Sequence, residues 1–224
     1  MEEILSQCTL FSLLTDGDQQ RLAATAISRR FKSGEWILNY GDIWPYLFLV
    51  MDGSVTAVKE SMEGRSLIIE TFDSREIFWG MAFFIDDAPM LVRLVAAEDS
   101  HLLMWPKKQL QPILARNGAA SWELSVLLIG RMQHASDIVE DLAFQPVAGR
   151  LARFLVDRFG ETEGERVTRD LTLDEIAAHI GSTREMVSRI LHRFASEGMI
   201  EITRTEFKFR DRDGLKQLAQ NTND

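Results

Sequence analysis

The sequence predicts an α+β chain with an N-terminal antiparallel β-domain, a long helix and a C-terminal winged helix-turn-helix. The β-domain, a small barrel or a sandwich, is indicated by short aromatic and β-branched runs that alternate with glycine turns from residue 31 onward. The long helix is indicated by a proline-free stretch at 119–142. Two capping boxes around Gly181 and an alternating segment after Gly198 indicate the winged helix-turn-helix. The predicted domains are 1–118, 119–145 and 146–224.

The 224 residues have an ordinary composition for a globular chain, with 46% apolar and 26% charged residues. That length allows one large domain or two small ones, and the composition rules out a collagen, a coiled-coil rod or disorder throughout. The formal net charge of −9 is unevenly distributed. Residues 1–144 hold 12 basic and 20 acidic side chains, residues 145–224 hold 13 and 14, and the stretch 181–212 holds 7 and 5. The acidic excess therefore describes the N-terminal half and leaves a nucleic-acid partner open for the C-terminal half.

The N-terminal part is predicted to run from helices into the β-domain. Residues 1–30 carry apolar residues at broadly helical spacing, and Asp16 and Asp18 are plausible start signals. Pro106 is expected to end the β region, and a short helix at 107–116 is expected to be interrupted near Pro112. The predicted β segments are residues 35–40, 46–51, 54–60, 65–72 and 90–105.

The stretch from Ala119 to Leu142 is predicted to be one helix that pairs with a copy of itself. A series of its residues is spaced at heptad intervals, as in helices that supercoil around each other. A second stripe of Trp122, Val126 and Ile129 predicts that the helix also lies on its own β-domain. Packing on the β-domain alone is the alternative that so short a run leaves open. The predicted dimerisation seam is Ser125, Leu128, Met132, Ala135, Val139 and Leu142.

A hinge is predicted at 143–146, between the long helix and the next one. Pro146 suits the first turn of a new helix, where its missing N–H costs no hydrogen bond. The following helix is expected over 146–159, with a polar, acidic loop at 160–164. The hinge is therefore the natural boundary of the C-terminal domain.

The C-terminal domain carries the most specific motif of the chain. The residues TLDE at 172–175 form a capping box that opens a helix over 173–180. The residues STRE at 182–185 form a second capping box, which opens a helix that ends near Glu197. Gly181 allows the tight turn between the two helices. The alternating segments that predict a two-stranded wing are 200–203 and 206–210.

The solvent face of the second helix is predicted to read DNA. Arginine pairs with guanine O6 and N7, and glutamate accepts from cytosine N4. The first two turns of a recognition helix are the part that enters the major groove. A solvated face with mixed charges is the alternative, but the two capping boxes, the turn glycine and the wing favour DNA binding. The candidate DNA-contacting residues are Thr183, Arg184, Glu185, Ser188, Arg189 and Arg193, with His192 on the same face.

Three groups of residues match a known pattern along nearly the whole chain. They are Gly34-Glu35, Gly41-Asp42 and Gly53 in the turns, LAFQPVAGRLARFL at 142–155, and IGSTREMVSRILHRF at 180–194. In this order they resemble the cyclic-AMP receptor protein and fumarate–nitrate reduction regulator (Crp/Fnr) family of bacterial transcription factors. The resemblance implies a β-roll of the cyclic-nucleotide-binding type and a homodimer on palindromic DNA. It also implies base contacts by Arg184, Glu185 and Arg189, which with Ser188 look like the branch that favours TTGAT-type half-sites.

The sensor segment departs from the cyclic-AMP branch of that family. That branch has a Gly-Glu pair for the ribose and an Arg-Ser or Arg-Thr pair for the cyclic phosphate, and the aligned positions are Trp79-Gly80 and Met90-Leu91. A phosphodiester would lack its polar partners there, and Arg93 would point to the other face of its strand. We therefore expect a signal other than cyclic AMP. The candidate effector pocket is Trp79, Gly80, Met81, Phe83, Met90 and Leu91, with Met132, Ala135 and Ser136 on the long helix.

The segment IFWGMAFFIDDAP at 77–89 is similar instead to nitric-oxide-responsive denitrification regulators of the family, some of which use haem. His101 or His134 is then a possible haem ligand, although histidines in such places are more often structural or exposed. Cys8 is the only cysteine, so one chain forms neither an intramolecular disulfide nor a four-cysteine iron–sulfur cluster. No other metal site is predicted, and the effector stays open.

Two other classes of function compete with this one. An enzyme is disfavoured because the sequence has no Gly-rich phosphate loop, no His-Glu-x-x-His and no clear serine nucleophile elbow. A regulatory module that binds a small molecule and acts only through protein contacts is the alternative, which Arg184, Glu185 and Arg189 disfavour. No signal peptide or membrane span is indicated, so a cytoplasmic protein is expected. The expected partners are double-stranded DNA, a second copy of the chain, and RNA polymerase if the protein activates transcription.

Overall fold

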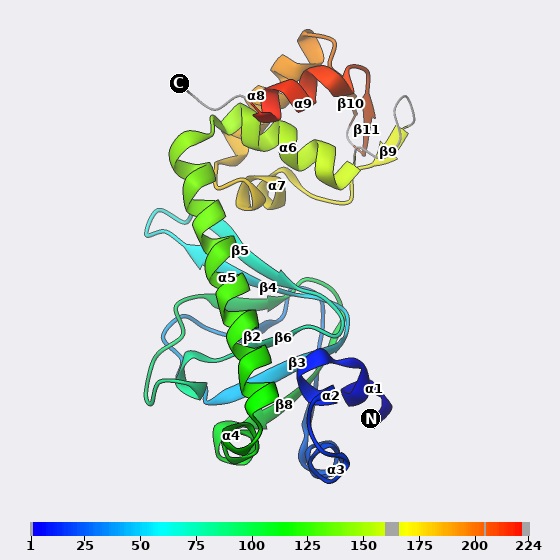
Figure 1. Cartoon of the computed structure of the whole chain (residues 1–224). Coiled ribbons are helices and arrows are strands. Elements are labelled where there is room, and N and C mark those ends of the chain that lie inside the picture. Colours follow the sequence, from blue (N-terminus) through cyan, green and yellow to red (C-terminus); the bar gives the residue numbers. More distant parts are fainter. Residues whose placement is uncertain (1, 160–165, 204, 221–224) are drawn as a thin grey trace. The chain divides into compact units, whose positions relative to one another are not determined.

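The computed structural model describes residues 2–159, 166–203 and 205–220 (Figure 1). The chain divides into two compact units, the first Met1–Lys59 with Ile69–His134 and the second Glu60–Ile68 with Ala135–Asp224. The dividing line on the C-terminal side falls inside the long helix α5 (Gly118–Phe144). The domain boundaries at 118 and 145 stay predictions.

The first unit begins with three short helices, α1 (Glu2–Gln7), α2 (Thr9–Ser12) and α3 (Asp16–Thr25). Asp16 and Asp18 lie in the first turn of α3, as predicted, and the Thr15 hydroxyl caps it by accepting from the Asp18 amide. The predicted helical character up to residue 30 is wrong, because Ile27–Phe31 forms strand β1. This strand pairs antiparallel with β8 (Ser100–Pro106), which satisfies its backbone groups from a distant part of the chain.

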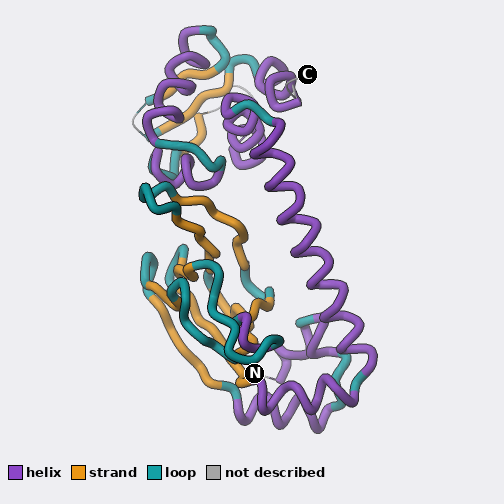
Figure 2. The backbone as a smooth tube through the Cα atoms, turned by 90° about the vertical axis from the view of Figure 1, so that its left-hand side faces the viewer, coloured by secondary structure: helices purple, strands orange, loops and turns teal. Residues whose placement is uncertain are grey.

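Two four-stranded sheets make up the β-domain, with strand orders β1-β8-β3-β6 and β2-β7-β4-β5. The strand pairings within these two sheets whose registers are known are antiparallel, as predicted. Figure 2 shows these strands as the orange segments of the tube. The remaining strands are β2 (Trp36–Leu38), β3 (Tyr46–Asp52), β4 (Val55–Glu60), β5 (Ser66–Phe72), β6 (Ile77–Trp79) and β7 (Arg93–Ala96).

The predicted segment 90–105 is two strands rather than one. Between β7 and β8 the chain turns, since the Ala97 amide donates to the Ser54 carbonyl and the Asp99 carboxylate accepts from the Ser33 amide at 3.0 Å. Strand β6 and the short 3-10 helix η1 (Met81–Phe83) have no counterpart in the sequence prediction. Runs this short and apolar carry too little periodicity to be recognised locally.

Strand β3 separates two apolar cores. Leu47 and Leu49 face a core shared with α1 to α4 and with Trp105, whose indole N–H donates to the Leu22 carbonyl at 2.8 Å. Phe48 and Val50 face the second core, which lies between the two sheets. The alternation along one strand therefore holds the sheet pair together on one face and the helices on the other.

Helix α4 (Lys107–Arg116) contains Pro112 and continues through it, so the predicted interruption is wrong. Three buried side chains of α4, Leu110, Ile113 and Leu114, anchor the helix on both sides of the proline. Pro106 ends the β region, as predicted.

Helix α5 exceeds its predicted bounds by one residue at its start and two at its end. It packs on the β-domain through Ala120 and Leu124, which are buried, and Leu127, which is half-buried. The stripe predicted for this contact is wrong, because Trp122, Val126 and Ile129 are 73%, 48% and 53% exposed. Both stripes have helical spacing, and only the position of the neighbouring helices decides between them.

The second unit is a helical domain with a three-stranded sheet of order β10-β11-β9. The predicted two-stranded wing gains β9 as a third strand, and a terminal helix, α9, was not predicted. The predicted loop at 160–164 lies outside the described residues. The elements are α6 (Val147–Phe159), β9 (Arg166–Thr168), α7 (Leu173–His179), α8 (Arg184–Ser196), β10 (Ile200–Ile202), β11 (Glu206–Phe209) and α9 (Arg212–Gln220).

Among the described residues, none of the helices combines the length and apolar character that a bilayer crossing requires.

Candidate nucleic-acid interface

Helices α7 and α8 are joined by a short turn at Gly181. The capping box at the start of α7 is confirmed, since the Thr172 hydroxyl accepts from the Glu175 amide at 3.2 Å and the Glu175 carboxylate accepts from the Thr172 amide at 2.6 Å. Gly181 has φ of +61°, and a Cβ there would lie 2.6 Å from the Leu142 side chain. The turn therefore needs glycine for its conformation and for the close approach of Leu142.

The second capping box is not formed as predicted. Thr183, not Ser182, caps α8, and its hydroxyl accepts from the Met186 amide at 3.3 Å. Ser182 is held in the turn, where its amide donates to the Ala177 carbonyl at 2.9 Å. The helix consequently starts one residue later than the sequence motif suggests.

Helix α8 has one buried and one exposed face. Val187, Ile190, Leu191 and Phe194 are buried in a core shared with α6, α7 and the wing. The structure brings all the predicted DNA-contacting residues together on and beside the opposite face. Of these, Arg184, Glu185, Arg189 and Arg193 are exposed with His192, and Thr183 and Ser188 are half-buried.

The charged groups on this face are held by weak surface contacts. Arg184 forms an ion pair with Asp174 at 3.1 Å, with both side chains more than 60% exposed. Arg193 lies 4.0 Å from Glu197. Exposed pairs of this kind contribute about 0–1 kcal/mol, so an incoming phosphate or base edge can displace them.

Glu185 is poised to act as a hydrogen-bond acceptor. Hydrogen bonds from its own backbone amide and from the Thr183 hydroxyl lower the pKa of its carboxyl. The carboxylate is exposed and stays ionised at neutral pH, which is the form that accepts from the cytosine amino group.

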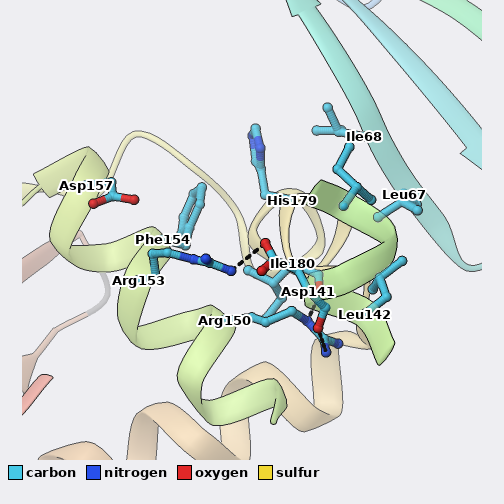
Figure 3. Close-up of a pocket in the computed structure, with 11 residues that line it drawn as sticks. Leu67, Ile68, Asp141, Leu142, Arg150, Arg153, Phe154, Asp157, His179 and Ile180 are labelled. Carbon is cyan, nitrogen blue, oxygen red and sulfur yellow. Dashed lines mark hydrogen bonds and ion pairs between the residues drawn. The ribbon is translucent and has the colours of Figure 1, made fainter. Parts of the chain in front are cut away.

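Arg150 on α6 is a structural residue to which the sequence prediction assigned no role, although it lies in the 142–155 motif. Its guanidinium donates to the Gln145 carbonyl at 2.7 Å. It also donates to the carbonyl of Ile180 at 2.9 Å, and both Arg150 and Ile180 are labelled in Figure 3. Longer bonds reach the carbonyls of Asp141 at 3.3 Å and Gly181 at 3.4 Å. One side chain thus joins the end of α5 to the turn of the helix-turn-helix.

Arg150 also lines a pocket, which contains an ion pair of a second arginine and a stacked pair of rings. Arg153 forms an ion pair with Asp141, and the Phe154 ring stacks on His179 with centroids 4.9 Å apart (Figure 3). Burial, followed by the charge of Arg158, lowers the pKa of His179. These contacts fix the C-terminal ends of α5 and α7 against α6, which positions α8.

The candidate effector residues of the β-domain are not gathered around one cavity. Trp79 and Phe83 pack against the helix-side core, whereas Met81 and the buried Met90 pack in the core between the sheets. Leu91 is 49% exposed. A Cβ on Gly80 would lie 1.9 Å from the Trp44 carbonyl oxygen.

On α5, three further candidate effector residues, Met132, Ala135 and Ser136, are exposed in the single chain.

The candidate haem ligands lie in polar surroundings. The His101 ring bonds the Ser28 hydroxyl at 2.7 Å and lines a hollow with Arg30, Lys32 and Asp52. His134 is half-exposed and lies 3.9 Å from the Glu70 carboxylate. These neighbours do not fit an apolar macrocycle, and the haem hypothesis gains no support from them.

Two domain families match the chain in sequence. The cyclic nucleotide-binding domain matches residues 28–117, and the Crp-like helix-turn-helix domain matches residues 149–218. The first covers most of the β-domain and the second covers the helix-turn-helix with its wing and α9.

Similar proteins extend the match across the linking helix. A CRP-like cAMP-activated global transcriptional regulator of Mycobacterium tuberculosis is 26% identical over 225 residues, covering 98% of this chain and 100% of that protein. The cyclic AMP receptor protein of Thermus thermophilus is 27% identical, covering 88% and 91%.

A solved structure has the same fold. A putative regulator of the crp/fnr family from Eubacterium rectale aligns over 95% of this chain and 98% of its own, with a TM-score of 0.80 and 21% identity.

The two domains and the full-length relatives agree on one family of regulators, and the helix-turn-helix implies DNA binding. The chain thus combines a cyclic nucleotide-binding domain with a Crp-like helix-turn-helix domain, and it is similar along nearly its whole length to CRP-like transcription regulators.

Proposed function

We propose that this regulator binds a palindromic, TTGAT-like DNA site as a homodimer, with α8 of each copy in a major groove. The observation that carries the proposal is the exposed face of α8, where Arg184, Glu185 and Arg189 project from a helix capped by Thr183. Two arginines and an ionised glutamate match the acceptors of guanine and the donor of cytosine. A twofold-symmetric protein with such helices reads half-sites about one helical turn apart.

The homodimer is supported by the predicted seam on α5. Leu128, Met132, Val139 and Leu142 are between 37% and 66% exposed in the single chain, and Ser125 and Ala135 are exposed with them. An apolar stripe at heptad spacing gains stability when a second copy of the helix covers it. Self-association through α5 gives the symmetry that a palindromic site requires.

The signal is proposed to be something other than cyclic AMP, in contrast to the two named relatives. Neither Trp79-Gly80 nor Met90-Leu91 offers a carboxylate or a cation. The Arg93 guanidinium lies 4.1 Å from the centre of the Trp36 ring, and Trp36 is 57% exposed. Arg93 therefore points toward the outer face of strand β7. The likeness of 77–89 to nitric-oxide-responsive regulators makes nitric oxide the first small molecule to test.

The mechanism we propose is a ligand- or redox-dependent reorientation. A signal in the β-domain shifts packing along α5, and the predicted hinge at 143–146, where α5 ends and α6 begins, changes the spacing of the two α8 helices. If the DNA-bound form activates transcription, RNA polymerase is its further partner. A regulatory module that acts only through protein contacts is the competing function.

Selection from random duplex DNA, followed by gel-shift assays, tests the function. We expect an enriched palindrome with TTGAT-like halves. Arg189→Ala should cost about 1–3 kcal/mol per half-site for the selected sequence and relax its specificity, because one bidentate base contact is lost. Lys216→Ala on α9 is the matched control and should leave specificity unchanged. Failure to enrich any sequence would favour the protein-contact module, and full specificity in Arg189→Ala would remove that residue from the reading face.

A further inference from the structure

A depression lies between α8, the start of α7 and strand β10. Three apolar side chains, Leu173, Leu191 and Ile202, contribute to it. Its polar lining is formed by Arg169, Ser188, His192 and Thr203, and no carboxylate belongs to the lining. The Arg169 guanidinium, the His192 imidazole and the Ser188 hydroxyl can each donate a hydrogen, so the depression suits a group that accepts hydrogen bonds. The Thr203 hydroxyl is already used within the wing, where it donates to the Glu206 carbonyl at 3.4 Å.

Arg169 is the cation of this depression, and its backbone is fixed. Its amide donates to the Thr205 carbonyl at 2.8 Å, which ties the segment before α7 to the wing. The side chain is half-buried. Among the residues that the structure describes, no carboxylate pairs with Arg169, whereas Arg166, Arg184 and Arg210 each pair with one. A partly desolvated cation is favoured by an anion from outside the chain.

The depression lies beside the proposed reading face, where a DNA phosphate would be the nearest anion. Ser188 lines it and also belongs to the proposed reading face, one residue before Arg189. When a recognition helix lies in the major groove, the two sugar–phosphate strands pass along its flanks, and contacts there go to phosphate rather than to bases. His192 on α8 and Arg169, which precedes α7, both lie on the side of α8 that faces the wing.

We propose that this depression binds a backbone phosphate of the DNA, with Arg169 as its principal cation and His192 and Ser188 as further donors. The inference rests on the proposed DNA-binding function and adds a contact that carries no sequence information. It gives each copy of the chain an anchor on the wing side of α8.

Salt-dependent binding of two duplexes tests the proposal. Arg169→Gln is compared with the full-length protein on the selected palindrome and on a random duplex of equal length, at several salt concentrations. Each lost phosphate contact reduces the slope of log K against log[salt] by about 0.9, so a dimer should lose about 2. Affinity for both duplexes should fall by a similar factor, leaving their ratio unchanged. Lys216→Gln removes the same charge from α9 and should change neither quantity.

Two further variants keep the test decisive. Arg169→Lys retains the charge and should keep most of the slope. His192→Glu places a carboxylate at an exposed position, where folding is not at risk, and should weaken binding to both duplexes. Wild-type slope and affinity in Arg169→Gln, or unchanged binding in His192→Glu, would overturn the proposal. If the wild type itself shows no sequence preference, it is the proposed function that fails.

Discussion

At the scale of single residues, Arg150 organises the second unit. Its guanidinium serves carbonyl oxygens from two places, Gln145 at the end of α5 and Ile180 at the end of α7. Burial lowers the pKa of Arg150, yet arginine keeps its charge at any pH the fold tolerates. A carbonyl that loses its donor on folding is costly, so this side chain supports the position of α8 from inside the second unit.

Replacing Arg150 by alanine should lower the unfolding free energy of the second unit by about 2–4 kcal/mol, because several charge-assisted hydrogen bonds are lost together. Amide hydrogen exchange of α6 and α7 in the full-length protein measures the effect. All five tryptophans, Trp36, Trp44, Trp79, Trp105 and Trp122, lie in the first unit, so their fluorescence checks that the first unit is unaffected.

Arg153→Ala is the matched control for that experiment. Its ion pair with Asp141 is partly exposed, and its loss should cost at most about 1 kcal/mol. Equal effects of the two substitutions would show that the carbonyl contacts of Arg150 contribute no more than an ordinary surface pair.

At the scale of elements, α5 carries the proposed dimer contact. Val139 is 66% exposed and belongs to the predicted seam, so its side chain contributes little to the stability of the single chain. Val139→Glu should dissociate the dimer, because two like charges would be buried opposite each other without partners, at a cost of about 3–5 kcal/mol.

Native mass spectrometry and sedimentation measure the state of Val139→Glu. Gln133→Glu adds the same charge at an exposed position off the seam and should remain dimeric. A dimeric Val139→Glu protein would place the self-association surface elsewhere.

Elements with local signals were predictable, and elements that depend on distant partners were not. Helix α5 needs only the absence of proline, and α7 needs only Thr172 and Glu175, so both were found. Strand β1 depends on pairing with β8, for example of Arg30 with His101. The residues of β1 alone contain no pattern that predicts this distant partner.

The candidate sites divide in the same way. One face of α8 follows from helical spacing, and the prediction placed its residues together. The β-domain members of the effector set are divided between two cores and the surface, because the burial of Met90 and the exposure of Leu91 depend on how the sheets pack. Arg150 binds backbone carbonyls, and Arg169 lines a surface depression. Neither feature produces a recognisable sequence pattern.

At the scale of the whole molecule, the distribution of charge and the proposed effector region determine the expected response to DNA and to cyclic AMP. The net charge of −9 resides almost entirely in residues 1–144, which DNA repels. Cyclic AMP should neither bind tightly nor change the affinity for the selected palindrome, because its phosphate finds no cation at Met90-Leu91. Calorimetric titration and gel shifts with and without the nucleotide measure this, and tight, specific binding would overturn the expectation.

The second unit is discontinuous in the chain, since residues 60–68 join it from far upstream. Leu67 is one of the side chains closest to Gly181 in the helix-turn-helix turn. A fragment starting at Ala135 would therefore lack Leu67, which lines one pocket together with Leu142 and Ile180. We therefore expect that a chimera joining residues 135–224 to another N-terminal domain is less stable unless that domain supplies an apolar side chain in the place of Leu67.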